Sequence, residues 1–167
     1  MGMKLITTIG FSCLLISWSP AQDLDPGPKA KSIIEKQMVY KTVGESALQV
    51  DLFLPLDSAD HERRPAIAFF HGGGWVFGEP ATFHQAGRRF ADRGYVVAVF
   101  QYRLSINEDG SYPHSDITPV ESTRDARSAL RWMKAQAEVL RIDPDRIIAS
   151  GHSVGGQLSF ATALCDE

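Results

Sequence analysis

Two uninterrupted apolar runs constrain the fold of this chain more than any other feature. They are PAIAFFHG at residues 65–72 and YVVAVFQYR at residues 95–103. Strands buried on both faces of a parallel sheet have this continuous apolar character, whereas half-buried strands alternate. Residues 81–93 between them carry apolar side chains at helical spacing and are followed by Gly94, a typical helix C-terminal cap. The order of strand, helix and strand predicts a right-handed βαβ unit.

Segments on either side extend this pattern. LQVDLFLP at residues 48–55 alternates as a half-buried strand does, and we expect it to pair with residues 38–43. Thr118, Pro119 and Glu121 have the spacing of a capping box with proline at the first helical position. A helix is therefore predicted to start there, and its apolar stripe continues to about Leu140.

The last predicted elements surround a serine. IDPD at residues 142–145 predicts a turn, residues 146–150 a buried strand, and QLSFATAL at residues 157–164 a helix. Strands that alternate with helices of this length are typical of the α/β class. We therefore expect a mainly parallel sheet with helices on both faces.

The serine lies in the segment Gly151-His152-Ser153-Val154-Gly155, which has the G-x-S-x-G pattern between a strand and a helix. A sharp turn at this point strains the serine backbone, and glycines two residues away on each side avoid a collision. The turn would lift the hydroxyl above the carboxyl edge of the sheet, at the positive end of a helix. Ser153 is the candidate nucleophile, and the alternative is an ordinary Gly/Ser-rich turn.

A second glycine-rich segment, His71-Gly72-Gly73-Gly74-Trp75, directly follows the first apolar run. HGGG after an early strand supplies the amides of the oxyanion hole in lipases and esterases. An oxyanion needs donors already aimed at it, and losing one donor costs roughly 10²- to 10³-fold in rate. The alternative is a flexible turn that leaves the strand, but two such motifs at one sheet edge favour an active site.

The chain resembles the N-terminal part of an α/β-hydrolase of the hormone-sensitive-lipase-like carboxylesterase group, from about residue 36 onward. The segments that carry the resemblance are FFHGGGWVFGEP at 69–80, QYRLS at 101–105, DARSALRWMKAQA at 125–137 and IDPDRIIASGHSVGGQLS at 142–159. The resemblance implies an incomplete fold with about the first five strands. It also implies a sheet order that leaves strand 146–150 as an exposed apolar edge, where another chain could pair.

The resemblance also implies roles for single residues. Ser153 would be the nucleophile, and the oxyanion-hole amides would come from Gly73, Gly74 and Val154. His71 and Asp125 would be structural rather than catalytic. The group hydrolyses carboxylic esters without a cofactor. Exported members with tryptophan after HGGG resemble esterases of acylated carbohydrates, although Trp75 could equally serve packing.

The catalytic acid and base are missing from this chain if the resemblance holds. In such hydrolases the order is nucleophile, acid and then histidine, and only 14 residues follow Ser153. The remaining histidines are interpreted as surface residues; they are His61, His84, His114 and His152. Two alternatives stay open: a non-catalytic half-domain, and a serine peptidase that shares the G-x-S-x-G-G turn.

The N-terminus predicts export. Residues 1–21 have the positive start, short apolar stretch and small-residue cleavage site of a signal peptide. Residues 22–36 are expected to be a polar linker and residues 37–167 the hydrolase part. Cleavage would remove Cys13 and leave Cys165 without a disulfide partner. The protein is expected to be secreted or periplasmic, with no permanent membrane span.

Charge and composition exclude several classes of partner. The formal net charge of −3 and pI of about 5.9 provide no basic stripe for nucleic acid. No pair of histidines or cysteines has metal-ligand spacing, so no metal is expected. The resemblance implies that no other cofactor is needed. The expected partner is a small-molecule ester.

Overall fold

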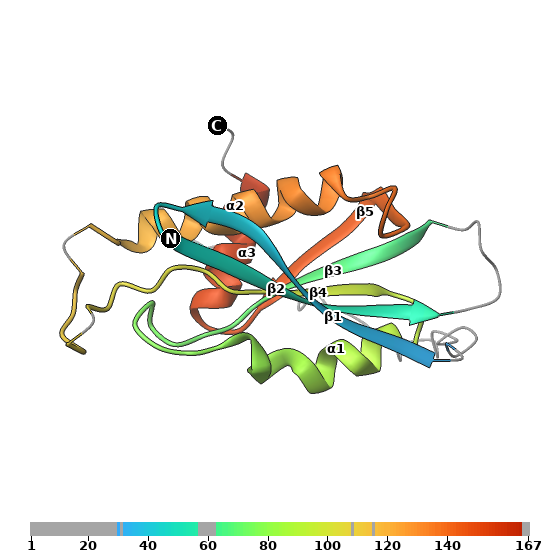
Figure 1. Cartoon of the computed structure of the whole chain (residues 1–167), viewed down its shortest axis with the longest axis horizontal. Coiled ribbons are helices and arrows are strands. Elements are labelled where there is room, and N and C mark those ends of the chain that lie inside the picture. The colour runs from blue at the N-terminus through green and yellow to red at the C-terminus, as the bar shows by residue number, and fades with distance from the viewer. Residues whose placement is uncertain (1–29, 31, 57–62, 108, 115, 165–167) are drawn as a thin grey trace, which may run out of the picture.

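The computed structural model describes residues 30, 32–56, 63–107, 109–114 and 116–164. The predicted signal peptide, Cys165 and His61 lie outside the described residues. Among the described residues, one sheet contains five strands, which cross the centre of Figure 1. They are β1 Ser32–Val43, β2 Ser46–Leu56, β3 Arg64–Phe70, β4 Val96–Phe100 and β5 Ile142–Gly151.

The strand order is β1-β2-β4-β3-β5. β1 pairs with β2, and β2 with β4, in antiparallel orientation, whereas β3 pairs with both β4 and β5 in parallel. The predicted pairing of residues 38–43 with 48–55 is confirmed, with Met38 opposite Val50. The α/β class and the five strands are also confirmed, but the sheet is mixed rather than mainly parallel.

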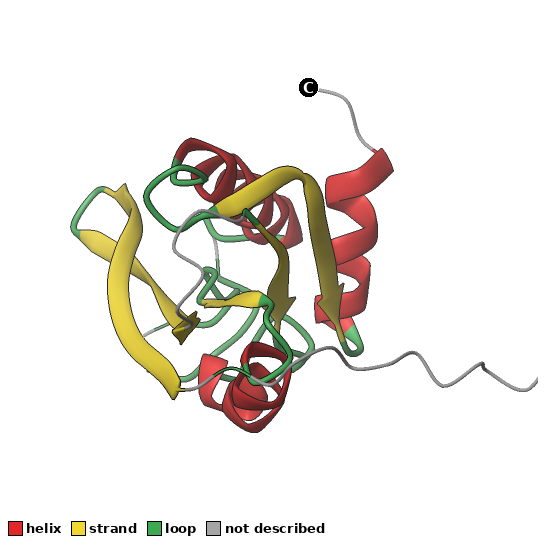
Figure 2. Cartoon of the chain, turned by 90° about the vertical axis from the view of Figure 1, so that its right-hand side faces the viewer, coloured by secondary structure: helices red, strands yellow, loops and turns green. Residues whose placement is uncertain are grey.

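Helices cover both faces of the sheet, as predicted (Figure 2). They are η1 Pro80–Phe83, α1 His84–Ala91, α2 Pro119–Ala135 and α3 Val154–Leu164. Met133 of α2 and Leu158 of α3 are buried in one core, on the same face as Phe70 and Phe100. Ala91 of α1 is buried in a smaller core on the other face.

Two expected boundaries differ from the structure. β1 begins at Ser32, so residues 32–36 of the expected linker are part of the sheet. Residues 142–145 are not a separate turn but belong to β5. There, Arg64 pairs with Ile142 and Ala66 with Ile147, so a bulge places four residues of β5 opposite one of β3. Pro144 lies in this bulge. Proline has no N–H to donate to a neighbouring strand, and it is tolerated here because β5 pairs with only one described strand.

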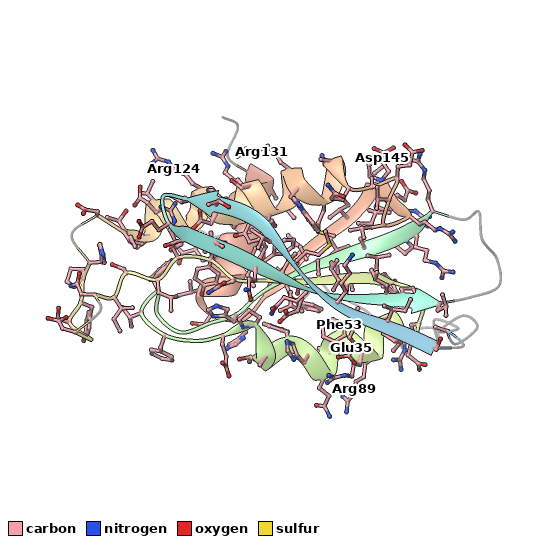
Figure 3. The ribbon with its side chains drawn as sticks, in the orientation of Figure 1. Glu35, Phe53, Arg89, Arg124, Arg131 and Asp145 are labelled. Carbon is pink, nitrogen blue, oxygen red and sulfur yellow. The ribbon has the colours of Figure 1, made fainter. Side chains whose placement is uncertain are left out.

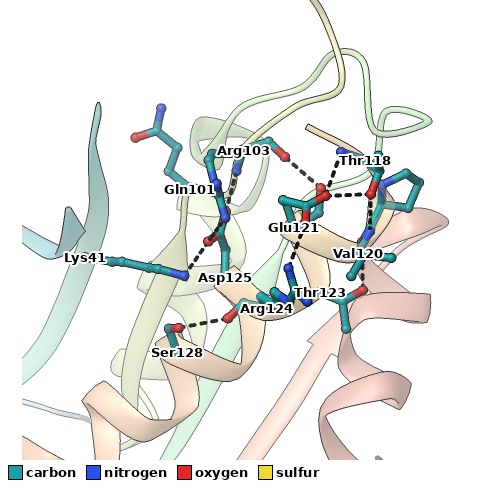
Figure 4. Close-up of polar contacts among 12 residues, drawn as sticks. Lys41, Gln101, Arg103, Thr118, Val120, Glu121, Thr123, Arg124, Asp125 and Ser128 are labelled. Carbon is teal, nitrogen blue, oxygen red and sulfur yellow. Dashed lines mark hydrogen bonds and ion pairs between the residues drawn. The ribbon is translucent and has the colours of Figure 1, made fainter. Parts of the chain in front are cut away.

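Helix α2 begins as its sequence predicts. The side chain of Thr118 accepts a hydrogen bond from the Val120 amide, and the Glu121 carboxylate accepts from the amide and hydroxyl of Thr118. These contacts, drawn in Figure 4, satisfy amides that the first turn of a helix leaves without partners. In the described part of the chain, no helix is long and apolar enough to cross a membrane.

Candidate active site

Ser153 lies in the tight turn between β5 and α3. It has a positive φ of 54°, which is unusual for a residue with a side chain. Its hydroxyl has no hydrogen-bond partner among the described residues, and the residue is exposed. Val154 is the first residue of α3, where an amide has no partner within the helix. The turn therefore presents a strained serine beside a free helix-terminal amide.

The flanking glycines allow the turn to lie directly on β3. A Cβ atom at Gly155 would be 1.9 Å from the carbonyl oxygen of Phe70, and one at Gly151 would be 2.4 Å from the same oxygen. Phe70 also pairs with Gly151 at the end of the sheet. No side chain fits in these positions, so the backbone of the serine turn contacts the start of the HGGG segment.

The HGGG segment continues the contact. A Cβ atom at Gly72 would be 2.6 Å from Nε2 of His152, the residue that precedes Ser153. The structure thus brings the two predicted motifs together at the carboxyl edge of β3 and β5. The contacts run from His152 and Gly155 of the serine turn to His71 and Gly72 at the start of the HGGG segment.

Gly73 and Gly74 form the bend of the HGGG loop, with φ values of 129° and 61°. The carbonyl of Gly73 accepts hydrogen bonds from the amides of Val76 and Phe77, at 3.1 and 3.0 Å. A Cβ atom at Gly73 would be 1.8 Å from the carbonyl oxygen of Phe77, so only glycine fits. Among the described residues, no hydrogen bond uses the amide of Gly73 or Gly74 as its donor. Both N–H groups can therefore donate to an anion.

His71 is a buried part of this loop, with 1% of its surface exposed. Its Nδ1 lies 2.8 Å from the carbonyl oxygen of Gly72, and it must donate because a carbonyl only accepts. Burial lowers the pKa of His71, and the hydrogen bond to Gly72 opposes that shift. The ring is held inside the loop, which agrees with the expected structural role and leaves it no contact with Ser153.

Trp75 also faces the interior. It has a positive φ of 65°, and its half-buried side chain packs against the core beneath α2 and α3. Its indole nitrogen is buried without a hydrogen-bond partner among the described residues. Of the two roles that the sequence left open, the structure favours packing over contact with a sugar.

His84 and His114 have hydrogen-bond partners away from Ser153. His84 of α1 contacts Asp51 of β2 at 2.8 Å, and Nδ1 of His114 accepts from the amides of Asp116 and Ile117. His84 and His114 are both half-buried, so the prediction of surface histidines was too simple for them. The described residues contain no histidine that is hydrogen-bonded to Ser153. The catalytic base is therefore not assigned.

The contact of His84 belongs to a polar seam between α1 and the β1–β2 hairpin. Arg88 donates two hydrogen bonds to Glu35, at 2.6 and 2.8 Å, and its guanidinium lies over the ring of Phe53. Figure 3 shows Glu35 and Phe53 above α1, with Arg89 on the opposite side of the helix. This seam holds α1 against the β1–β2 hairpin. No group of acidic, histidine or cysteine side chains in the described residues could hold a metal ion.

Asp125 is a buried anchor behind the loop that follows β4. Its carboxylate, which is fully buried, accepts from Lys41 at 2.6 Å and from the backbone and side chain of Arg103 (Figure 4). Ser122 of α2 also donates to the carbonyl of Arg103. The hydrogen bonds to Asp125 raise the pKa of Arg103, so the guanidinium stays charged. Asp125 thus has the structural role that was expected, with no contact to the candidate site.

Comparison with known proteins identifies similar chains among esterases. The family model BD-FAE matches residues 50–167. A probable isoprenylcysteine alpha-carbonyl methylesterase ICME of Oryza sativa subsp. japonica is 30% identical over 119 residues, covering 71% of this chain and 26% of that protein. Gut esterase 1 of Caenorhabditis elegans is 30% identical over 114 residues, covering 67% of this chain and 20% of that protein.

Solved structures of an esterase give the same result. The esterase Est2 of Thermogutta terrifontis has a TM-score of 0.66 and 34% identity, covering 81% of this chain and 44% of that one. A structure of Thermogutta terrifontis esterase 2 phosphorylated by paraoxon has a TM-score of 0.67 and 36% identity, covering 75% of this chain and 45% of that one. The chain thus spans less than half the length of these relatives.

Proposed function

The chain belongs to the BD-FAE family of α/β-hydrolases, and from this premise we propose that it carries the nucleophile and oxyanion hole of a carboxylic ester hydrolase. The observation that supports the proposal best is the strained backbone of Ser153 against the HGGG loop. A serine held this way is exposed to solvent, and its turn contacts a loop in which the amides of Gly73 and Gly74 donate to no other described residue.

In the proposed reaction the hydroxyl oxygen of Ser153 attacks the carbonyl carbon of the ester. The serine proton passes to a general base, which is not assigned among the described residues. The amides of Gly73, Gly74 and Val154 donate to the oxyanion of the tetrahedral intermediate, which collapses to release the alcohol and leave an acyl-serine. Water then attacks the acyl carbon, the bond to the serine oxygen breaks, and the carboxylic acid leaves as the serine hydroxyl regains a proton.

Hydrolysis of p-nitrophenyl acetate tests the proposal directly. We expect the chain to release p-nitrophenolate faster than its Ser153→Ala variant. Ser159→Ala is the matched control, because Ser159 lies on α3 and donates to the carbonyl of Gly155. An oxyanion hole with substrate binding but no triad retains about 10³- to 10⁴-fold over water in intact triad enzymes. Equal rates for the wild type and Ser153→Ala would contradict Ser153 as the nucleophile of this chain.

Paraoxon provides a second test that does not depend on turnover. Thermogutta terrifontis esterase 2 has been solved in its phosphorylated form, after reaction with paraoxon. In the proposed step the oxygen of Ser153 bonds to phosphorus, p-nitrophenolate leaves, and the serine proton goes to solvent. We expect mass spectrometry to find diethyl phosphate on the peptide that contains Ser153, and none in Ser153→Ala. A phosphate found only elsewhere would contradict the assignment of the nucleophile.

We also propose that the protein is exported, on the signal-like sequence of residues 1–21. The test is N-terminal sequencing of protein that has been expressed with its full N-terminus in a bacterial host. A mature chain that begins after Ala21 in the periplasm or medium is expected. Cytoplasmic protein that keeps Met1 would contradict the proposal.

We further propose that the outer edge of β5 pairs with a strand from another chain. Within the described residues β5 pairs with β3 alone. Ile148 of β5 and Phe160 of α3 are large apolar side chains with 49% and 66% of their surface exposed. Unpaired edges with exposed apolar side chains are templates for intermolecular pairing.

A further inference from the structure

The segment that follows β4 touches the HGGG loop at two points. The hydroxyl of Tyr102 donates to the carbonyl oxygen of His71 at 2.8 Å, and the amide of Ser105 donates to that of Trp75 at 2.6 Å. These two contacts lie at either end of the loop and bracket Gly73 and Gly74. Residues 102–105 therefore hold both ends of the loop that carries the proposed oxyanion hole.

Tyr102 makes the first of these contacts through its side chain. Its side chain is buried, with 2% of its surface exposed, and burial raises the pKa of its hydroxyl, so the group stays a donor. The ring stacks on that of His71, with centroids 4.3 Å apart and planes 18° apart. Tyr102 therefore fixes both the backbone and the ring of His71.

The ring of His71 in turn determines where one amide points. Its Nδ1–H donates to the carbonyl oxygen of Gly72. That carbonyl shares a planar peptide unit with the N–H of Gly73, so the two groups point in opposite directions. A hydrogen bond that holds the carbonyl of Gly72 toward the ring aims the Gly73 amide away from it. The orientation of the ring is thus transmitted to the amide.

We propose that Tyr102 is a positioning residue of the oxyanion hole, which orients the amide of Gly73 through His71. The inference rests on the proposed function, because it concerns the orientation of the Gly73 amide, which that function places in the oxyanion hole. The segment that carries Tyr102 is fixed from the other side, since Asp125 holds the backbone and side chain of Arg103. Tyr102 therefore has a rigid support, and loss of its hydroxyl changes the loop rather than the segment.

The test observes the amide itself. Only three glycines in the chain directly follow another glycine: Gly73, Gly74 and Gly156. In protein labelled with ¹⁵N,¹³C-carbonyl glycine, an HNCO spectrum therefore shows these three amides alone. We expect Tyr102→Phe, which keeps the ring, to shift the Gly73 signal and to leave that of Gly156 in place. Gly156 lies in α3 and reports whether the serine turn remains folded.

Tyr40→Phe is the matched control. Tyr40 is also buried, and its hydroxyl donates to a backbone carbonyl, that of Gln101, at 2.7 Å. The two variants lose the same kind of hydrogen bond, but only Tyr102 contacts the HGGG loop. A Gly73 shift no larger than that of Tyr40→Phe would overturn the proposal. Equal shifts of all three signals would also overturn it, because they indicate a general structural role.

The rate of phosphorylation by paraoxon is the functional readout. We expect Tyr102→Phe to slow the reaction of Ser153 by about tenfold, less than the roughly 10²-fold that a 1 Å misplacement can cost, and Tyr40→Phe to leave it unchanged. An unchanged rate in Tyr102→Phe would contradict a positioning role. If the wild type itself does not react at Ser153, the proposed function fails, whereas the Gly73 signal still decides the orientation of the amide.

Discussion

Residue 155 must be glycine because another strand occupies the space of its side chain. A Cβ atom there would be 1.9 Å from the carbonyl oxygen of Phe70 and 2.8 Å from that of His71. Both neighbours are backbone atoms, so relief requires movement of β3 or of the serine turn. The same contact keeps the two halves of the candidate site together.

We expect Gly155→Ala to destabilise the fold by about 3 kcal/mol or more, at the upper end of the cost of overpacking. Gly44→Ala is the control, because Gly44 has a φ of 57° but no atom within 4 Å of its Cβ position. That change should cost only about 1 kcal/mol, the penalty of the left-handed conformation. Urea unfolding of both variants measures the difference, and equal losses would contradict the close contact.

His71 predicts a pH dependence of stability. Burial lowers its pKa below the ordinary 6.5. Between the lowered pKa and 6.5, His71 is therefore protonated in the unfolded chain but neutral in the folded chain. The contribution of neutral His71 is complete above pH 6.5 and declines as the pH falls toward the lowered value. Urea unfolding at several pH values should therefore show a smaller loss on acidification for His71→Gln than for the wild type. Parallel curves would mean that His71 does not titrate differently in the two states.

At the scale of single elements, α2 depends on the cap at its first turn. The hydrogen bonds from Thr118 lower the pKa of Glu121 to about 2, so the carboxylate that closes the box is ionised at neutral pH. We expect Thr118→Ala to lower the free energy of unfolding by about 1 kcal/mol. Ser128→Ala, in the middle of the same helix, should stay within about 0.5 kcal/mol. Thermal unfolding compares the two, and an equal effect would mean that the cap contributes nothing.

Much of the element order could be predicted from the sequence because periodicity and caps are local signals. The capping box of α2 and the apolar runs of β3 and β4 are examples. The extension of β5 through residues 142–145 could not, because Asp and Pro favour turns. Here these residues form a bulge between Ile142 and Ile147, which both pair with β3.

The same limit applies to the candidate site. Local glycine patterns indicated Ser153 and the HGGG segment, and the resemblance added the roles of Gly73, Gly74 and Val154. These roles remain predictions even though the fold brings the segments together. The contacts of Tyr102 and Asp125 were not predictable, although both residues lie in segments that carried the resemblance. The βαβ pattern indicated that β3 and β4 share a parallel sheet, but it does not specify which side chains after β4 reach the HGGG loop or α2.

At the scale of the whole molecule, the edge of β5 is expected to control association. We predict that the chain forms oligomers at high concentration and that Ile148→Lys weakens them by roughly tenfold, which corresponds to about 1.4 kcal/mol of lost burial. Val139→Lys is the control, since Val139 is 78% exposed but lies outside the sheet. Light scattering over a concentration series measures both. A wild type that stays monomeric would contradict pairing at this edge.

The strand order also has a consequence for the synthesis of the protein. β3 ends at Phe70, but β5, one of its two neighbours, begins 72 residues later at Ile142. At 5 to 20 residues per second, a ribosome needs about 4 to 14 s to supply that neighbour. During this interval the apolar β3 has emerged without its full set of partners, so a chaperone that binds apolar segments has time to act on it. β3, which ends at the candidate site, is therefore synthesised well before the strand that completes its pairing.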